Sequence, residues 1–169
     1  MNHTPKIGIV VSEFNRNITQ LLQEGALQQL KEKNIIIPKE QLFLVPGAVE
    51  LPLIAAALAA QKTYDAVICL GSVIQGESDH YDYVCWQVSY GCQKVALEYN
   101  IPVIFGVLTT QNEQQAYDRC GGLHGHKGKE AADAALQMIN VMNTVRKNTE
   151  YAQPVTHLSG AYRDAMSEQ

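Results

Sequence analysis

The sequence predicts an α/β domain in which a four-stranded parallel sheet lies between two layers of helices. Four short runs rich in β-branched residues alternate with longer segments of helical spacing, and one run is almost wholly apolar. Parallel strands need crossover connections, which are right-handed, so helices should cover both faces of the sheet. The simplest solution is a three-layer αβα sandwich with strand order 2-1-3-4.

The first half of the chain contains two strand-and-helix units. Lys6–Val11 is a β-branched run that ends at Ser12, and the next twenty residues have helical spacing. Residues 41–45 predict the second strand. Pro46-Gly47 interrupts it before an alanine-rich helix over residues 49–61.

The second half continues this alternation. Residues 65–71 form the near-continuous apolar strand expected of a sheet covered on both faces. A loop follows up to His80, and residues 81–100 have helical spacing. Residues 101–108 predict the fourth strand, in which Pro102 is tolerated because it lies at the start.

The remaining residues predict two helices and a tail. A short helix is expected over residues 113–120, then a flexible glycine-rich loop over 121–128 and a long helix over 130–145. Residues 1–147 should form the single domain. The polar tail, residues 148–169, should be partly disordered or packed on a neighbouring subunit.

Composition and charge exclude several classes of protein. The chain has 169 residues, enough for one domain or two small ones, and a net charge of -4 that argues against nucleic acid as a main partner. Only 18% of residues are charged, which indicates surface hidden in a homo-oligomer. No apolar run is long enough to span a membrane and no signal peptide is visible, so a cytoplasmic location is expected.

The four cysteines predict neither disulfides nor zinc. They form no CxxC pair, and Cys69 lies in an apolar run, so they should be reduced core residues. Cys120, His124 and His126 match no standard zinc spacing. We therefore expect no metal site.

Chemically unusual residues cluster where strands end. The carboxyl ends of parallel strands meet at one edge of a sheet, which places residues 12–15, 46–50, 71–80 and 109–110 together. Phe14 could be a stacking platform for a flat heterocycle or a hydrophobic staple for the next helix. Glu50 could accept hydrogen bonds from ligand hydroxyls or complement the start of its helix.

The loop before His80 has two interpretations. Gly76 and Ser78 before a helix could bind phosphate through backbone N–H groups, or could form a turn with a serine cap. His80 could act as a general acid and base, or could be an ordinary surface histidine. Arg119 and Lys127 could clamp an anion, or could be a solvated basic pair near helix ends.

Five segments together resemble the lumazine synthase family. They span most of the predicted domain and are far more specific in combination than singly: Ser12–Asn15, Pro46–Pro52, Gly71–Val84, Asn112–Gly121 and Lys127–Ala132. The resemblance implies a flavodoxin-like sandwich. It also implies an enzyme that condenses 5-amino-6-ribitylaminouracil with 3,4-dihydroxy-2-butanone 4-phosphate, without metal or organic cofactor, to give 6,7-dimethyl-8-ribityllumazine, phosphate and water.

The resemblance also implies a role for each matching residue. His80 would move protons, while Phe14 would stack on the pyrimidine and Arg119 would hold the phosphate from the neighbouring subunit. The other residues expected to contact substrate are Ala48, Val49, Glu50, Ser72, Val73, Ile74, Glu77, Ser78, Phe105 and Lys127. If the site is split between subunits, the monomer is inactive. The resemblance implies that the family's ring of five is the smallest working oligomer, and a sixty-subunit shell is compatible.

The sequence departs from the family pattern at three positions. Gln75 stands where arginine is common, Glu77 where a small residue is common, and His126 where asparagine is common. The first two make the region near the phosphate more negative. They leave open a structural shell that has lost activity. A non-catalytic binder of a flavin-like ligand is a further alternative, because this kind of sandwich hosts many binding modules, but a binder would not need His80.

Overall fold

Four parallel strands form the central sheet of the computed structural model, which describes residues 4–151. The strands are β1 (Ile7–Ser12), β2 (Leu42–Val45), β3 (Ala66–Ile74) and β4 (Val103–Thr110). They are ordered β2-β1-β3-β4, with β1 and β3 in the centre. The predicted order 2-1-3-4 is therefore confirmed.

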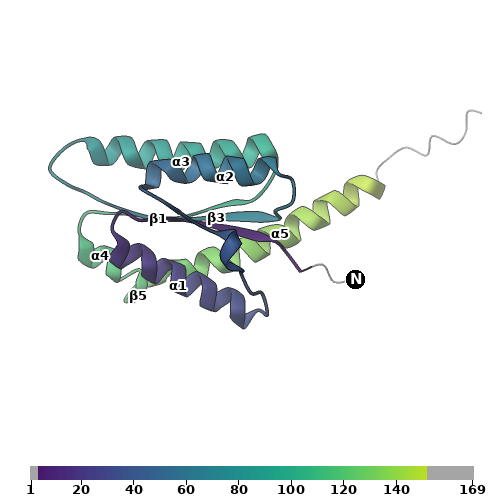
Figure 1. The fold of residues 1–169 in the computed structure, drawn as a ribbon, viewed down its shortest axis with the longest axis horizontal. Coiled ribbons are helices and arrows are strands. Elements are labelled where there is room, and N and C mark those ends of the chain that lie inside the picture. Colours follow the sequence, from purple (N-terminus) through teal and green to yellow (C-terminus); the bar gives the residue numbers. More distant parts are fainter. Residues whose placement is uncertain (1–3, 152–169) are drawn as a thin grey trace, which may run out of the picture. The chain divides into compact units, whose positions relative to one another are not determined.

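Helices cover both faces of the sheet, which confirms the predicted three layers (Figure 1). One face carries α2 (Leu51–Ala60) and α3 (His80–Tyr99), which lie side by side. The other carries α1 (Arg16–Glu32), α4 (Glu113–Tyr117) and the first part of α5 (Lys127–Tyr151). Two 3-10 turns, η1 (Lys39–Gln41) and η2 (Ala48–Glu50), flank β2.

Each face has its own apolar core. Ile18 and Leu22 of α1 pack with the alanines of α5 against one side of β1 and β3. Leu51 and Val88 pack against the other side. All four cysteines are free thiols, and Cys69 and Cys92 are buried as expected of core residues. Within residues 4–151, no helix is both long and apolar enough to cross a membrane.

The third strand is longer than predicted, since residues 71–74 belong to β3 and not to a loop. Its pairing with β4 continues to Ile74, opposite Thr110. Gly71 does not end the strand. A Cβ there would lie 3.2 Å from both Leu51 Cδ1 and Ser12 Oγ, so the missing side chain allows α2 and β1 to pack closely.

The predicted flexible glycine loop is instead a short antiparallel hairpin. Its strands are β5 (Cys120–Gly122) and β6 (Gly125–His126). Gly121 and Gly125 have φ values of 109° and 74°, which glycine adopts without the cost that a side chain would impose. The glycines therefore shape a defined turn.

The last helix begins and ends outside its predicted limits. It starts at Lys127, directly after β6, and residues 148–151 of the expected tail continue it. Residues up to Ile139 belong to the unit that contains the sheet, and residue 140 begins a second unit. The expectation for residues 152–169 lies outside the described part of the chain.

Candidate active site

A cavity of about 550 Å³ lies at the carboxyl ends of β1, β2 and β3. The loops after these strands and the first turns of α3 form its walls. Nine of the predicted site residues line it: Phe14, Ala48, Val49, Glu50, Ser72, Val73, Ile74, Ser78 and His80. The sheet edge therefore brings together most of the residues that the sequence singled out. Glu77, which is exposed, is not among the lining residues.

Phe14 lines the cavity with an exposed ring. Its side chain is 70% exposed, and the residue expected to pair with it in a hydrophobic staple is the polar Thr19. The staple interpretation is therefore wrong. Asn15 adopts a left-handed conformation with φ 56°, and its Nδ2 donates to the carbonyl of Ser72 at 2.9 Å. This bond ties the segment that carries the ring to β3.

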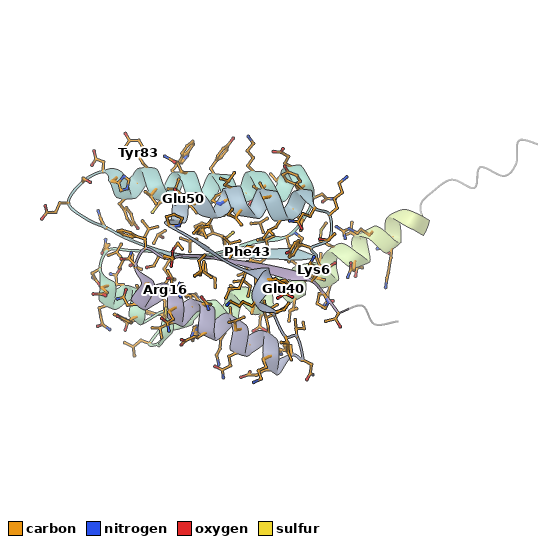
Figure 2. All side chains as sticks on the ribbon, in the orientation of Figure 1. Lys6, Arg16, Glu40, Phe43, Glu50 and Tyr83 are labelled. Carbon is orange, nitrogen blue, oxygen red and sulfur yellow. The ribbon has the colours of Figure 1, made fainter. Side chains whose placement is uncertain are left out.

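Glu50 has the structural role expected at the start of its helix, and it also lines the cavity. Its Oε2 accepts a hydrogen bond from the Gly47 N–H at 2.9 Å, which orders the turn before α2. The same side chain lines the cavity. It lies on the side of the sheet that α2 and α3 cover, as does Tyr83 (Figure 2).

His80 is the first residue of α3, and its side chain is exposed. The residue that caps this helix is Asp79, and its side chain makes no capping hydrogen bond, so a serine cap by Ser78 is not observed. Ser78 and His80 both line the cavity, at the positive end of the α3 dipole. An imidazole and a hydroxyl thus lie near backbone groups suited to an anion.

A second cavity, of about 420 Å³, lies between β4 and α5. It contains the three remaining predicted residues, Phe105, Arg119 and Lys127. Arg119 Nη1 donates to the Gln115 carbonyl at 2.9 Å, and Lys127 Nζ forms an ion pair with Glu130 at 2.6 Å. Thr109, predicted at the sheet edge with the other loops, also lines this second cavity.

The sequence of the chain matches one protein family over nearly all of the described residues. The family model of 6,7-dimethyl-8-ribityllumazine synthase matches residues 4–143. The chain belongs to this family. It is 53% and 54% identical to the 6,7-dimethyl-8-ribityllumazine synthases of Coxiella burnetii strains Dugway 5J108-111 and RSA 493 / Nine Mile phase I. Each alignment covers 145 residues, which are 86% of this chain and 96% of the relative. The predicted lumazine synthase family is therefore confirmed.

The lumazine synthase fold also brings residues into the first cavity that the sequence analysis did not single out as site residues. Tyr81, Tyr83, Val84 and Gln87 line it from α3. Burial raises the pKa of Tyr81, so its phenol stays protonated at neutral pH. Tyr83, Val84 and Gln87 lie three, four and seven residues after His80, so they share its helical face. This spacing could have identified them from the sequence.

The histidines and the cysteine of the hairpin are not grouped as a set of metal ligands in the described structure. Among residues 4–151, no three His, Cys, Asp or Glu side chains gather as metal ligands would. Cys120 and His126 lie opposite each other in the hairpin ladder. Burial raises the pKa of the Cys120 thiol to about 11, so it is protonated at neutral pH.

Proposed function

We propose that the chain condenses 5-amino-6-ribitylaminouracil with 3,4-dihydroxy-2-butanone 4-phosphate to form 6,7-dimethyl-8-ribityllumazine, phosphate and water. Membership of the family named for this product supports the reaction. The observation that carries the proposal is that an exposed aromatic ring, Phe14, and a titratable imidazole, His80, line the same cavity. A simple binding module needs the first group but not the second.

The first cavity offers a place for the pyrimidine and the ribityl chain. Phe14 would stack on the flat ring. Ala48, Val49 and Glu50 would hold the ring edge and the ribityl hydroxyls, and Ser72, Val73 and Ile74 would line the opposite side. The volume of about 550 Å³ lies in the range usual for small-molecule sites.

The reaction requires that two reactants are aligned and that protons are moved between them. The amine attacks the ketone and a first water leaves to give an imine. Phosphate is then eliminated, and the second amine of the pyrimidine attacks the carbonyl that this elimination produces, so that the ring closes with loss of a second water. His80 would accept and return protons during these steps, while the cavity aligns the two reactants. The resemblance to lumazine synthases implies that the reaction uses no metal or organic cofactor.

The phosphate would be held where two subunits meet. Arg119 and Lys127 are suited to bind an anion, but in one chain they line the second cavity and His80 lines the first. We infer that the second cavity of one subunit faces the first cavity of its neighbour. Phe105, Arg119 and Lys127 would then close the site, with Glu77 and Ser78 on the opposite side of the phosphate.

The outer surface of α3 supports assembly into a homo-oligomer. Large exposed side chains follow one another along this helix, and the rings of Trp86 and Tyr90 stack with centroids 5.3 Å apart. Tyr83 and Leu97 extend the surface at 66% and 73% exposure. Such a surface is typical of an interface between copies. Light scattering would distinguish a ring of five from a larger shell.

Incubation of the purified protein with both substrates tests the proposal. We expect lumazine absorbance and released phosphate to increase together. Binding of the product without turnover would favour a flavin-like binding module, and absorbance without phosphate release would contradict the assigned reaction. The free thiols also suit the reducing cytosol, where we place this reaction.

A further inference from the structure

The imidazole of His126 lies directly against the backbone of α1. A Cβ added to Gly25 would lie 2.0 Å from Cε1 of His126, 2.5 Å from Nε2 and 2.6 Å from Nδ1. No side chain could therefore occupy position 25 while the imidazole keeps its place. Gly25 leaves a notch in α1, and the ring of His126 fills it.

A second close approach holds the start of α5 against the same helix. A Cβ added to Gly128 would lie 2.1 Å from the carbonyl oxygen of Leu22, so the two backbones touch. Leu22 and Gly25 lie about one turn apart on α1. The segment of residues 126–128 is therefore fixed to α1 at two neighbouring points.

The residue between these two points is Lys127, which lines the second cavity together with Arg119. The Lys127 N–H donates to the Arg119 carbonyl at 2.8 Å. The backbones that carry the two cations are therefore joined to each other, and one of them is adjacent to the ring seated on Gly25. A movement of His126 would move Lys127 and, through this bond, Arg119.

The imidazole of His126 contributes to the contact with Gly25 by packing and not by charge. Its Nδ1 is buried and has no hydrogen-bond partner among the described residues. Burial, together with the nearby Lys129, lowers the pKa of His126, so the ring is neutral at pH 7. A neutral ring supplies no charge to the phosphate, and its contribution must come from packing.

We propose that His126 is a positioning residue whose ring, seated in the Gly25 notch, holds Lys127 and Arg119 in the geometry that binds the phosphate of the second substrate. This inference rests on the proposed function. In this proposal His126 contacts neither substrate. The close contact between the hairpin and α1 contributes to substrate recognition by holding the two cations in place.

Three variants test the proposal: His126→Ala, Gly25→Ala and the double variant. We expect each single variant to raise the KM for the butanone phosphate about five- to tenfold, with kcat and the KM for the ribitylaminouracil changed less than about twofold. In the double variant the added methyl group occupies the space that the ring has left, so the KM should lie closer to wild type than in either single variant. Inhibition by inorganic phosphate should weaken in parallel.

Matched controls separate positioning from a general loss of stability. His124→Ala removes an exposed histidine from the same hairpin, and Gly8→Ala adds a clash with Leu58 in the other core. Neither should change the KM for the phosphate substrate. If Gly25→Ala fails to fold, the KM values of His126→Ala alone test the proposal.

The proposal is overturned if His126→Ala leaves the phosphate KM and phosphate inhibition at wild-type values, or changes both substrate KM values equally. An inactive wild-type protein would instead refute the proposed function. In that case phosphate binding, measured by calorimetry on wild type and His126→Ala, still tests whether the ring positions the two cations.

Discussion

The two cavities differ in their place on the sheet and in the polar and charged side chains that line them. The first lies at the ends of three strands, is lined mainly by apolar and aromatic side chains, and contains the imidazole of His80. The second lies on the edge strand β4 and contains the cations Arg119 and Lys127. The first suits a flat ring and proton transfer, and the second suits an anion. This difference supports the proposal that one chain carries two complementary half-sites.

Removal of Arg119 should have the largest effect on the second cavity. We expect Arg119→Ala to raise the KM for the butanone phosphate about a hundredfold, because charge-assisted hydrogen bonds are worth about 1.5–3 kcal/mol. The KM for the ribitylaminouracil should stay within about twofold. Arg119→Lys is the control, since it keeps the charge but loses the bidentate geometry. Unchanged affinity for the phosphate substrate would remove Arg119 from this role.

Removal of His80 should affect rate more than binding. We expect His80→Ala to lower kcat by about 10- to 100-fold, at the low end of general acid and base effects, because alignment supplies much of the acceleration. Steady-state kinetics with both substrates measure it. A loss of more than about four orders of magnitude would show that proton transfer, and not alignment, dominates.

The aromatic platform should contribute a smaller effect confined to the first cavity. Phe14→Ala should raise the KM for the ribitylaminouracil about tenfold, since stacking on a heterocycle is worth about 1–3 kcal/mol. Phe14→Tyr keeps a ring and serves as the control. The distinction between the two half-sites fails if Phe14→Ala weakens binding of the butanone phosphate as strongly as binding of the ribitylaminouracil.

The smallest effect concerns the pH dependence of stability. Because the pKa of His126 is lower in the folded chain than in the unfolded chain, the unfolded chain binds protons more readily as pH falls. The stability that neutral His126 contributes is thus complete above its ordinary pKa, about 6.5, and is lost below it. We expect the urea midpoint to fall further between pH 7.5 and 5.5 in wild type than in His126→Asn. Equal decreases of the urea midpoint in wild type and His126→Asn would show that His126 is not the source of the pH dependence.

The layers and strand order could be predicted from sequence because strands and helices alternate with clear periodicity. Two of the errors lie at glycines. Gly71 suggested a turn, but it lies inside β3 because close packing with α2 and β1 requires a small residue. Gly121 and Gly125 suggested flexibility, whereas their positive φ angles shape a hairpin. Composition alone cannot distinguish a glycine that loosens a segment from one that lets it pack or turn.

The site could be predicted in part, because strand ends converge in any parallel sheet. Phe14, Glu50 and His80 meet in one cavity for this reason. The close contact between His126 and Gly25 could not be predicted, since it joins residues far apart in sequence through the geometry of a hairpin. The resemblance implied that Arg119 acts from a neighbouring subunit, and the structure places it in a separate cavity of the same chain.

Co-assembly of two defective chains tests the central claim that each site combines half-sites from two subunits. One chain would carry Phe14→Ala and His80→Ala, and the other Arg119→Ala and Lys127→Ala. Each would bear a different tag, so that mixed assemblies can be purified after co-expression. Random mixing in equal amounts should restore roughly a quarter of the sites, because each intact site needs one unaltered surface from each kind of chain. Mixed assemblies no more active than the mean of the two variants would contradict the account.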